Sequence, residues 1–283
     1  MRRPQEIAPE AIAMRSIVQL TGAFEGIASM HIARIKNQVQ QSEVFFDELW
    51  KIYTQLRVSN EFHTGHGHTE QSTIDRGLVI IITSEGSLSG NIDQRLVESL
   101  LEDYDSETQD ILVIGHHGAT LLSQRNVAYK SVYKLPEQDK NFDIEEILKE
   151  VQSYKTTTVH YQAYVSLMIQ EIKQIELNKE VQERGKKINK DEDYISDTNY
   201  IFEPSVPNVI DHMERSMLRV ALNEVILASK LAQQASRFRA MSAAQRRAKD
   251  SAEDLHLQLN YAKRSLKDER TIEIINGLRK EMA

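Results

Sequence analysis

The sequence contains no cysteine, and glycine and proline are scarce, at 11 and 5 of 283 residues. The absence of cysteine excludes a disulfide framework, a cysteine-ligated zinc site, an iron–sulfur cluster and thiol catalysis. No apolar run approaches the roughly 20 residues that cross a bilayer as a helix. Residues 1–10 carry two arginines and two prolines and lack the apolar core of a signal peptide. We therefore expect a soluble protein that is not exported.

Positive charge is also in deficit, because 35 lysines and arginines stand against 42 aspartates and glutamates, for a formal net charge of -7. This balance provides no global basic field, so it does not indicate a nucleic-acid partner. The charge is unevenly distributed: residues 1–58 sum to +1, residues 59–207 to -12 and residues 208–283 to +4. The two ends of the chain are therefore basic, and the middle is acidic.

The longest stretch without helix breakers lies near the C-terminus. Residues 208–276 contain neither glycine nor proline; Pro204 and Pro207 precede them and Gly277 follows, the order expected at the start and stop of a helix. Such a helix would span on the order of 100 Å, more than the width of any compact domain this chain could form. We therefore expect it to leave the globular part. An apolar seam supports a coiled coil, with steps of three and four positions at Met241, Ala244, Ala248, Ala252, Leu255, Leu259, Ala262 and Leu266.

A partner helix is predicted at the N-terminus, from about residue 11 to residue 57. Its apolar residues also step by three and four, with a shift of one position between two sets: Ile17, Leu20, Phe24 and Ile27, then Ala28, Ile32, Ile35, Val39, Phe46, Leu49, Tyr53 and Leu56. Alanines on one helix, and Gly22 and Gly26 on the other, allow a close approach of two backbones. The pattern predicts a long antiparallel coiled coil of the two chain ends, although it is also typical of a two-helix edge of an ordinary bundle.

The middle of the chain has a different pattern. Continuous apolar runs at 78–83 and 111–115 predict buried strands, and helices are expected at 91–104, 118–124 and 143–154. Residues 128–135 form a third β-rich segment, residues 156–167 and 169–177 are predicted as an antiparallel edge pair, and a charged connector follows at 179–193. This order predicts a small, mostly parallel sheet with helices on its faces. The fold class is therefore α/β, with a Rossmann-like α/β domain at residues 59–207 inserted between coiled-coil helices at 1–58 and 208–283.

A glycine-containing turn follows the first predicted strand, at residues 83–91. It occupies the position of a phosphate-binding loop before a helix. However, it lacks the third glycine of the dinucleotide fingerprint and the Gly-Lys-Ser/Thr end of the Walker loop, and Glu85 would repel phosphate. We interpret it as a structural turn with Asn91 as the helix cap, and we expect no cofactor on this chain.

Histidines offer a possible metal site, since His63, His66 and His68 lie within six positions and His116 and His117 follow the second predicted strand. The spacing lacks the rigid i, i+4 register of a helical site, and no cysteine can complete it. We therefore predict no metal centre. The sequence also contains no Gly-x-Ser-x-Gly elbow and no His-Glu-x-x-His helix, so no catalytic residue is predicted and the chain is expected not to be an enzyme.

Several segments spread along essentially the whole chain carry motifs of one known family. Residues 16–29 are similar to a family stretch that reads Ile-Thr-x-Ala-Met and then Val-Ala, residues 83–91 to its Ser-Asp-Arg-Gly-Leu-Cys-Gly-Asn turn, and residues 202–205 to its entry into the C-terminal helix. The most specific similarity is Arg237-Phe238-Arg239-Ala240-Met241 with Ala244 and Ala248, which resembles Arg-Met-x-Ala-Met-x-x-Ala. In these motifs the chain resembles the gamma subunit of the F-type ATP synthase, the central rotor shaft of its catalytic head, and it is identified as a divergent member of this family.

Several positions depart from the family pattern. Ser89 stands where many relatives have cysteine, and Gln233 stands where the family has glutamate. Lys263 and Arg264 replace the Arg-Gln pair that, in the family, contacts the catalytic subunit. The resemblance therefore implies a contact of altered, more electrostatic character at this position.

The resemblance implies a non-catalytic subunit of a proton-translocating complex, which couples rotation to conformational change at the catalytic sites of an alpha3beta3 ring. The implied partners are the alpha and beta subunits, which hold Mg-ATP and ADP, an epsilon-like subunit and the membrane c-ring, at the cytoplasmic face of a bacterial plasma membrane. The implied shaft-to-ring contacts are Arg237, Met241, Arg246, Arg247, Lys263 and Arg264, and the implied bearing tip comprises Ile272, Ile275 and Leu278. Two alternatives stay open: the shaft of a paralogous F-type ATPase complex with a non-synthase role, and a coiled-coil scaffold unrelated to ATPases.

Overall fold

The computed structural model describes residues 2–61, 74–86, 88–135, 144–177, 179, 203 and 205–281. The chain divides into two compact units. Unit 1 comprises Met1–Ala28 with Phe238–Ala283, and unit 2 comprises Ser29–Arg237. The predicted histidine site at 63–68 and most of the predicted connector at 179–193 lie outside the described residues.

Two long helices enclose a set of short elements in the sequence. The elements follow one another as α1 (Pro4–Glu61), β1 (Ile74–Ile82), α2 (Ile92–Asp103), β2 (Gln109–Ile114), α3 (His116–Gln124), β3 (Ser131–Tyr133), α4 (Glu145–Ser153), β4 (Tyr154–Tyr164), β5 (Gln170–Glu176) and α6 (Val206–Glu281). This confirms the predicted fold class and the predicted order of elements, with boundaries that differ by a few residues.

The five strands form one sheet in the order β3-β2-β1-β4-β5. Strand β1 pairs in parallel with both β2 and β4, and β2 pairs in parallel with β3. Only β5 is antiparallel, to β4, from which a short turn separates it. The mostly parallel sheet with one antiparallel pair at its edge is therefore confirmed.

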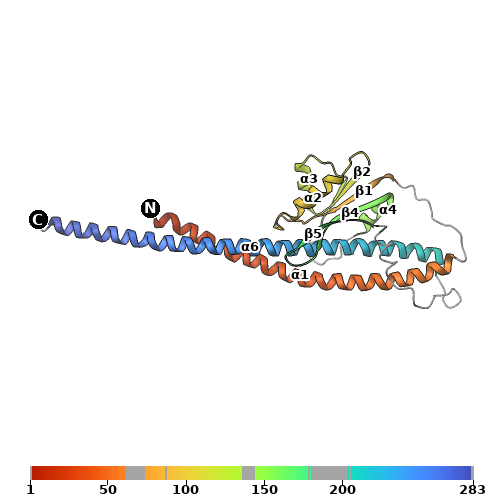
Figure 1. The fold of residues 1–283 in the computed structure, drawn as a ribbon, viewed down its shortest axis with the longest axis horizontal. Helices are drawn as coiled ribbons and strands as arrows, with labels where there is room; N and C mark the ends of the chain where they lie inside the picture. The colour runs from red at the N-terminus through yellow and green to blue at the C-terminus, as the bar shows by residue number, and fades with distance from the viewer. Residues whose placement is uncertain are drawn as a thin grey trace. The chain divides into compact units, whose positions relative to one another are not determined.

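Helices cover both faces of this sheet (Figure 1). Successive side chains of β1 point to opposite faces, because the side chains of a strand alternate. Val79 and Ile81 pack with residues of α2 and α3, whereas Leu78, Ile80 and Ile82 pack with residues of α4, α1 and α6. A strand that is buried on both faces consists of continuous apolar residues, which explains why β1 and β2 were recognisable from sequence.

Within unit 2, α1 and α6 pack together against the second face of the sheet. Phe46, Trp50 and Tyr53 of α1 belong to the same buried cluster as Met217 and Leu222 of α6. The Tyr53 hydroxyl also donates a hydrogen bond of 2.6 Å to Glu214. The two long helices therefore contribute to the same core as the inserted sheet.

Unit 1 pairs the N-terminal part of α1 with the C-terminal part of α6. A Cβ placed on Gly22 would overlap the side-chain amide of Gln245, so the end of this side chain lies against Gly22. Each residue of the seam predicted for α6 is buried or half-buried, with Ala248 and Ala262 the most deeply buried. The small-residue seam predicted for the C-terminal helix is therefore confirmed.

The seam predicted for the first half of α1 is wrong. Ile17, Leu20 and Ile27 are 44%, 60% and 42% exposed. The inward face instead steps without a shift through Ile7, Ala11, Met14, Val18, Thr21, Glu25, Ala28, Ile32, Ile35 and Val39, which are buried or half-buried. Several of these positions carry small or polar residues. A prediction from apolarity alone therefore chooses the neighbouring, more apolar stripe, which is exposed.

The predicted helix stop at Gly277 is also wrong, because α6 continues to Glu281. A glycine in a helix interior costs about 1 kcal/mol relative to alanine, which a long helix tolerates. At the other end, the backbone N–H of Asn208 lies 3.5 Å from the hydroxyl of Ser205, which precedes the helix. A serine three residues before that N–H is in the position of an N-cap.

Gly115, between β2 and α3, is the glycine whose backbone most requires the absence of a side chain. Its φ is 100°, and an added Cβ would overlap the carbonyl group of Thr83. We expect Gly115→Ala to lower the free energy of unfolding by about 2 kcal/mol or more, because it combines backbone strain with a clash against main chain.

The matched control is Gly26→Ala in α1, where no atom lies within 4 Å of the added Cβ. This change should leave stability unaltered or raise it by up to about 1 kcal/mol through helix propensity. Denaturant unfolding of the full chain, followed by circular dichroism, measures both variants. Equal losses of stability in the two variants would contradict the conclusion that the backbone at Gly115 excludes a side chain.

Candidate functional site

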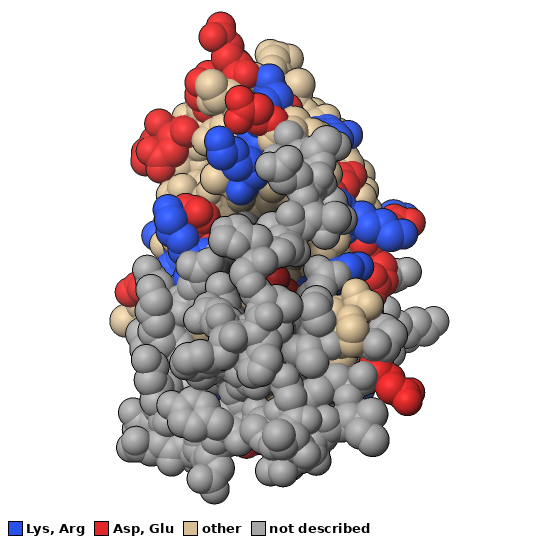
Figure 2. Space-filling view, turned by 90° about the vertical axis from the view of Figure 1, so that its right-hand side faces the viewer, with Lys and Arg blue, Asp and Glu red and all other residues tan. Residues whose placement is uncertain are grey.

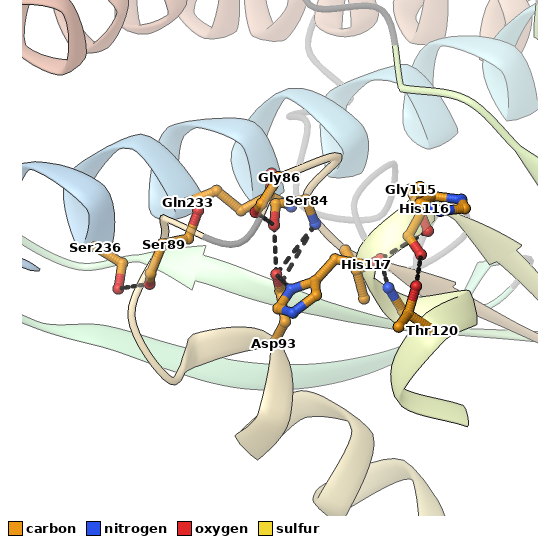
Figure 3. A network of polar contacts seen from close by, with 12 residues as sticks. Ser84, Gly86, Ser89, Asp93, Gly115, His116, His117, Thr120, Gln233 and Ser236 are labelled. Atoms are coloured by element: carbon orange, nitrogen blue, oxygen red, sulfur yellow. Dashed lines mark hydrogen bonds and ion pairs between the residues drawn. The ribbon is translucent and has the colours of Figure 1, made fainter. Parts of the chain in front are cut away.

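The carboxyl ends of β1 and β2 lie beside α6, and polar side chains are buried there. We call this set the polar junction; its members are Ser84, Asp93, His117, Gln162, Ser229 and Gln233. Figure 3 shows several of them with the neighbouring residues Ser89 and Ser236. Five elements or turns supply them: the turn after β1, α2, α3, β4 and α6. Each helix and strand end thus delivers one or two polar groups to a common point.

The turn after β1 is held to the turn after β2 by Thr83. Its hydroxyl lies 3.2 Å from the carbonyl oxygen of Ile114 and 3.1 Å from that of Gly115, and it accepts a hydrogen bond of 2.9 Å from the N–H of Gly118. The N–H of Thr83 also donates to Ile114 at 2.7 Å. These bonds hold the carboxyl end of β1, which leads into α2, against the end of β2 and the start of α3.

Two predictions for this turn are resolved by the structure. Asn91 occupies the N-cap position of α2, as predicted, but its side chain makes no capping hydrogen bond. Glu85, predicted to repel phosphate, accepts a hydrogen bond from the backbone N–H of Leu135. The turn is therefore tied to the segment after β3 through a carboxylate, which agrees with its interpretation as structural.

Asp93 is at the centre of the polar junction and is fully buried. Its Oδ2 accepts hydrogen bonds from the Ser84 hydroxyl at 2.5 Å and from Nδ1 of His117 at 2.8 Å. Its Oδ1 accepts a bond of 2.8 Å from the side-chain amide of Gln162, and the N–H of Ser84 lies 3.4 Å from both oxygens. A buried carboxylate requires such donors, because an unpaired one would be strongly destabilising.

Gln162 carries the connection from Asp93 to α6. With its nitrogen bound to Asp93, its Oε1 accepts a hydrogen bond of 2.5 Å from the Ser229 hydroxyl. The same oxygen lies 3.3 Å from Nε2 of Gln233, which also donates to Ser229 at 3.1 Å. Both α6 side chains are buried, so these bonds are shielded from water.

A second contact between α6 and the turn lies one helical turn further along. The Ser236 hydroxyl donates a hydrogen bond of 2.7 Å to the carbonyl oxygen of Ser89, and a terminal nitrogen of Arg237 lies 3.5 Å from the Ser89 hydroxyl. Ser229, Gln233 and Ser236 follow one another at i, i+4 and i+7, so they share one face of the helix.

Two histidines near this end of the sheet have shifted pKa values. The hydrogen bond to Asp93, reinforced by the charge of that carboxylate, raises the pKa of His117 above its ordinary value despite partial burial. Burial lowers the pKa of His160 on β4, whose Nδ1 has no hydrogen-bond partner among the residues that the structure describes. His117 is thus stabilised in its charged form, and His160 in its neutral form.

The presence of serine, histidine and aspartate together does not make a nucleophilic centre. Activation of a serine requires a histidine that accepts its proton, with the carboxylate on the far side of the imidazole. Here Asp93 lies between the other two, and both Ser84 and His117 bond to it. In the described part of the chain, no group of histidines and carboxylates could hold a metal ion. The geometry of the polar junction is suited to holding α2, α3, β4 and α6 together.

The structure separates the predicted shaft-to-ring residues. Arg237 is half-buried and contacts Ser89 within unit 2. In unit 1, Met241 is half-buried, whereas Arg246, Arg247, Lys263 and Arg264 are exposed. The three predicted tip residues are exposed by 57%, 47% and 55%, at Ile272, Ile275 and Leu278. Of this set, only Arg237 therefore lies next to the polar junction.

Sequence reasoning missed most of the polar junction. Gln233 was noted only as a departure from a family pattern, and Asp93, Gln162 and Ser229 were not considered. One feature pointed to them: Ser229, Gln233 and Ser236 lie on the inward face of α6, among buried residues such as Ile226 and Ala232. Polar residues on an apolar face indicate buried partners.

The chain matches a model of the ATP synthase family over residues 5–279. It is 21% identical to the ATP synthase gamma chain of Cytophaga hutchinsonii, with 96% of this chain and 97% of that protein covered. It is 23% identical to the ATP synthase gamma chain of Mycoplasma genitalium, with 97% and 98% covered. The similarity therefore extends over nearly the full length of both proteins.

Solved structures show a similar fold. A chain of the central stalk and c-ring structure of the Tetrahymena thermophila mitochondrial ATP synthase matches with a TM-score of 0.57 and 17% identity, covering 80% of this chain and 99% of that chain. A chain of the Euglena gracilis mitochondrial ATP synthase, in its OSCP, F1 and c-ring structure, matches with a TM-score of 0.54 and 14% identity, covering 91% and 94%.

The raised pKa of His117 predicts a pH dependence of stability. Its charged form is favoured in the folded state, so its contribution is fully present below the unfolded pKa of about 6.5 and is lost as the pH rises through the higher folded value. We expect His117→Gln to destabilise the chain more at about pH 5.5 than at about pH 8.5. Denaturant unfolding at the two pH values measures the difference.

The control is His256→Gln, which replaces an exposed histidine of α6 outside the polar junction. If both variants lose the same stability at each pH, the bond between His117 and Asp93 does not stabilise the fold in the way described.

Proposed function

We infer that this chain, which belongs to the ATP synthase gamma-chain family, is the central rotor shaft of an F-type ATP synthase or ATPase. The observation that carries this inference is the family match over residues 5–279, which includes both long helices and the inserted sheet. The chain is a non-catalytic subunit. Its activity is mechanical: it couples rotation to conformational change in other subunits.

A shaft of two helices works because it lacks threefold symmetry. Inside a ring of three alpha and three beta subunits, each orientation of the shaft favours a different set of open and closed catalytic interfaces. Rotation then shifts the affinities of the three sites for ADP, phosphate and ATP. Mg-ATP and ADP bind to the partner subunits, which also supply the groups for phosphoryl transfer.

We assign the ring contacts to exposed basic residues of unit 1. Arg246, Arg247, Lys263 and Arg264 are exposed on α6, where the seam residues Ala248 and Ala262 face inward. Charged groups at such a contact guide register and rate of association more than they add affinity. Met241 and Arg237, which are half-buried, complete the proposed set of contacts.

The end of α6 is the proposed bearing tip. Ile272, Ile274, Ile275 and Leu278 are all between 47% and 63% exposed. Apolar residues exposed on several sides of one helix are typical of a surface that a partner covers. A collar of apolar side chains at the top of the ring is the partner chemistry that this segment fits.

The inserted sheet is the proposed base of the rotor, in contact with an epsilon-like subunit and the c-ring. Residues 59–207, which contain the sheet, carry a formal net charge of -12, and on the described part of the face drawn in Figure 2 residues of both charge signs occur. Among the described residues, no helix is both long and apolar enough to cross a membrane. Attachment to the membrane is therefore proposed to be peripheral, through the c-ring, at the cytoplasmic face of a bacterial plasma membrane.

Removal of the basic pair in unit 1 tests the ring contact. We expect Lys263→Ala with Arg264→Ala to lower ATP-driven proton pumping about threefold or more while the complex still assembles, because two exposed charges contribute little to folding but guide the contact with the ring. Proton uptake and ATP hydrolysis by the isolated complex in liposomes provide the measurement.

The matched control is Lys267→Ala with Arg270→Ala, which removes the same charge from exposed positions one turn further along the same helix. Unchanged pumping in the first pair, or an equal loss in both, would remove Lys263 and Arg264 from the proposed contact.

Copurification tests the function as a whole. A tag on this chain should isolate a complex with alpha and beta subunits and ATPase activity. Isolation of a complex without ATPase subunits would favour a scaffold and contradict the rotor. A complex that hydrolyses ATP but does not synthesise it under an imposed proton gradient would identify the paralogous, non-synthase form.

A further inference from the structure

The contact between α6 and the inserted sheet in unit 2 contains polar groups that an ordinary helix contact would not need. Ser229, Gln233 and Ser236 are 0%, 4% and 1% exposed, on one face of α6. Buried polar groups are costly unless they are hydrogen-bonded. Apolar contacts alone do not fix how a helix is placed, because they have no direction. These three side chains therefore restrict α6 to one position on the sheet.

The direction of each hydrogen bond leads back to one carboxylate. A glutamine side chain offers two donors on its nitrogen and an acceptor oxygen, and the two ends can exchange places. Asp93 is an acceptor when ionised, so it selects the nitrogen of Gln162, at 2.8 Å. The oxygen of Gln162 must then face α6, where Ser229 donates to it at 2.5 Å.

We propose that Asp93 is a positioning residue which, through Gln162, fixes α6 to the inserted sheet so that the sheet and the shaft turn together. The proposal rests on the rotor function inferred above. Asp93 does not itself touch α6 in these contacts; it acts by orienting the glutamine that does. A joint of this kind transmits torque because sliding or rotation of α6 would leave buried polar groups unpaired.

His117 supplies a further donor to the same carboxylate. Charged or titratable groups of the segments that meet here include Asp93 on α2, Glu85 in the turn after β1, His116 on α3, His160 on β4 and Arg237 on α6. Of these, Asp93 makes the hydrogen bond to His117, at 2.8 Å.

Asp93→Asn separates this positioning role from a merely structural one. The asparagine oxygen can still accept from Gln162, but its NH2 group then replaces the oxygen that faces His117 and Ser84. An NH2 group satisfies the unprotonated Nδ1 of a neutral imidazole and opposes the N–H of a charged one. Without the carboxylate, burial favours the neutral form of His117, so asparagine should support the joint where alanine does not.

The experiment uses the complex isolated through a tag on this chain and reconstituted in liposomes. The readout is the number of protons taken up per ATP hydrolysed, relative to wild type at the same pH. We expect Asp93→Ala to lower this ratio about fivefold and Asp93→Asn to leave it close to wild type, near pH 6 and near pH 8.5 alike. Ser229→Ala with Gln233→Ala should lower the ratio as Asp93→Ala does, without any change at Asp93.

The matched control is Asp110→Asn. Asp110 lies on β2, accepts a hydrogen bond of 2.8 Å from Tyr154 and pairs with Arg76 at 2.8 Å. It is therefore a bonded carboxylate of the same sheet, and both of these partners lie outside α6. This variant should reduce the yield of complex, if anything, and leave the ratio unchanged at both pH values.

The outcomes distinguish this inference from the rotor assignment. If the wild-type complex pumps protons and Asp93→Ala lowers the yield of complex but keeps the wild-type ratio, or if Asp93→Asn lowers the ratio as much as Asp93→Ala does, the positioning role of Asp93 is overturned and the rotor stands. If the double α6 variant pumps normally, the joint does not carry torque. If the wild-type complex neither assembles with ATPase subunits nor pumps, the rotor function fails and this inference fails with it.

Discussion

Burial of polar side chains on the inward face of α6 is the constraint on which the organisation of unit 2 depends. Ser229, Gln233 and Ser236 lose contact with water when the helix packs, and each must find a partner. Those partners are the side chain of Gln162 and the carbonyl of Ser89, on different elements. The turn after β1 and the C-terminal end of β4 must therefore meet at one place beside α6.

This arrangement gives specificity where apolar packing would give only stability. Leu222 and Ile226 bury apolar surface in the same core cluster, and other apolar residues of similar volume could do the same. The hydrogen bonds from Ser229 and Gln233 to Gln162, by contrast, exist in one register only. A shift of α6 by one residue moves it by about 1.5 Å and rotates it by about 100°, which breaks them. A shaft that must follow its base without slipping needs this property.

Much of the fold was predictable because its patterns are long and unbroken. The apolar runs of β1 and β2 are continuous, and the α6 seam from Met241 to Leu266 keeps the helical spacing of three and four positions throughout. The polar junction was not predictable, because its members lie as far apart as Ser84 and Gln233 and no local pattern joins them. Asp93 and Gln162 look in sequence like ordinary surface residues of a helix and a strand; tertiary packing alone buries them.

The wrong seam in α1 has a physical cause that follows from the proposed function. A helix that faces one partner within its own chain carries one apolar stripe, whereas a helix of a shaft inside a ring faces two. Ala11, Thr21 and Ala28 form part of the stripe that is buried against the rest of this chain, and they are small, which permits close approach. The larger Leu20 and Ile27 remain exposed at 60% and 42%, available to other subunits. Hydrophobicity ranks the second stripe above the first, so a rule that assigns the most apolar face to the chain's own core selects the wrong one in such a helix.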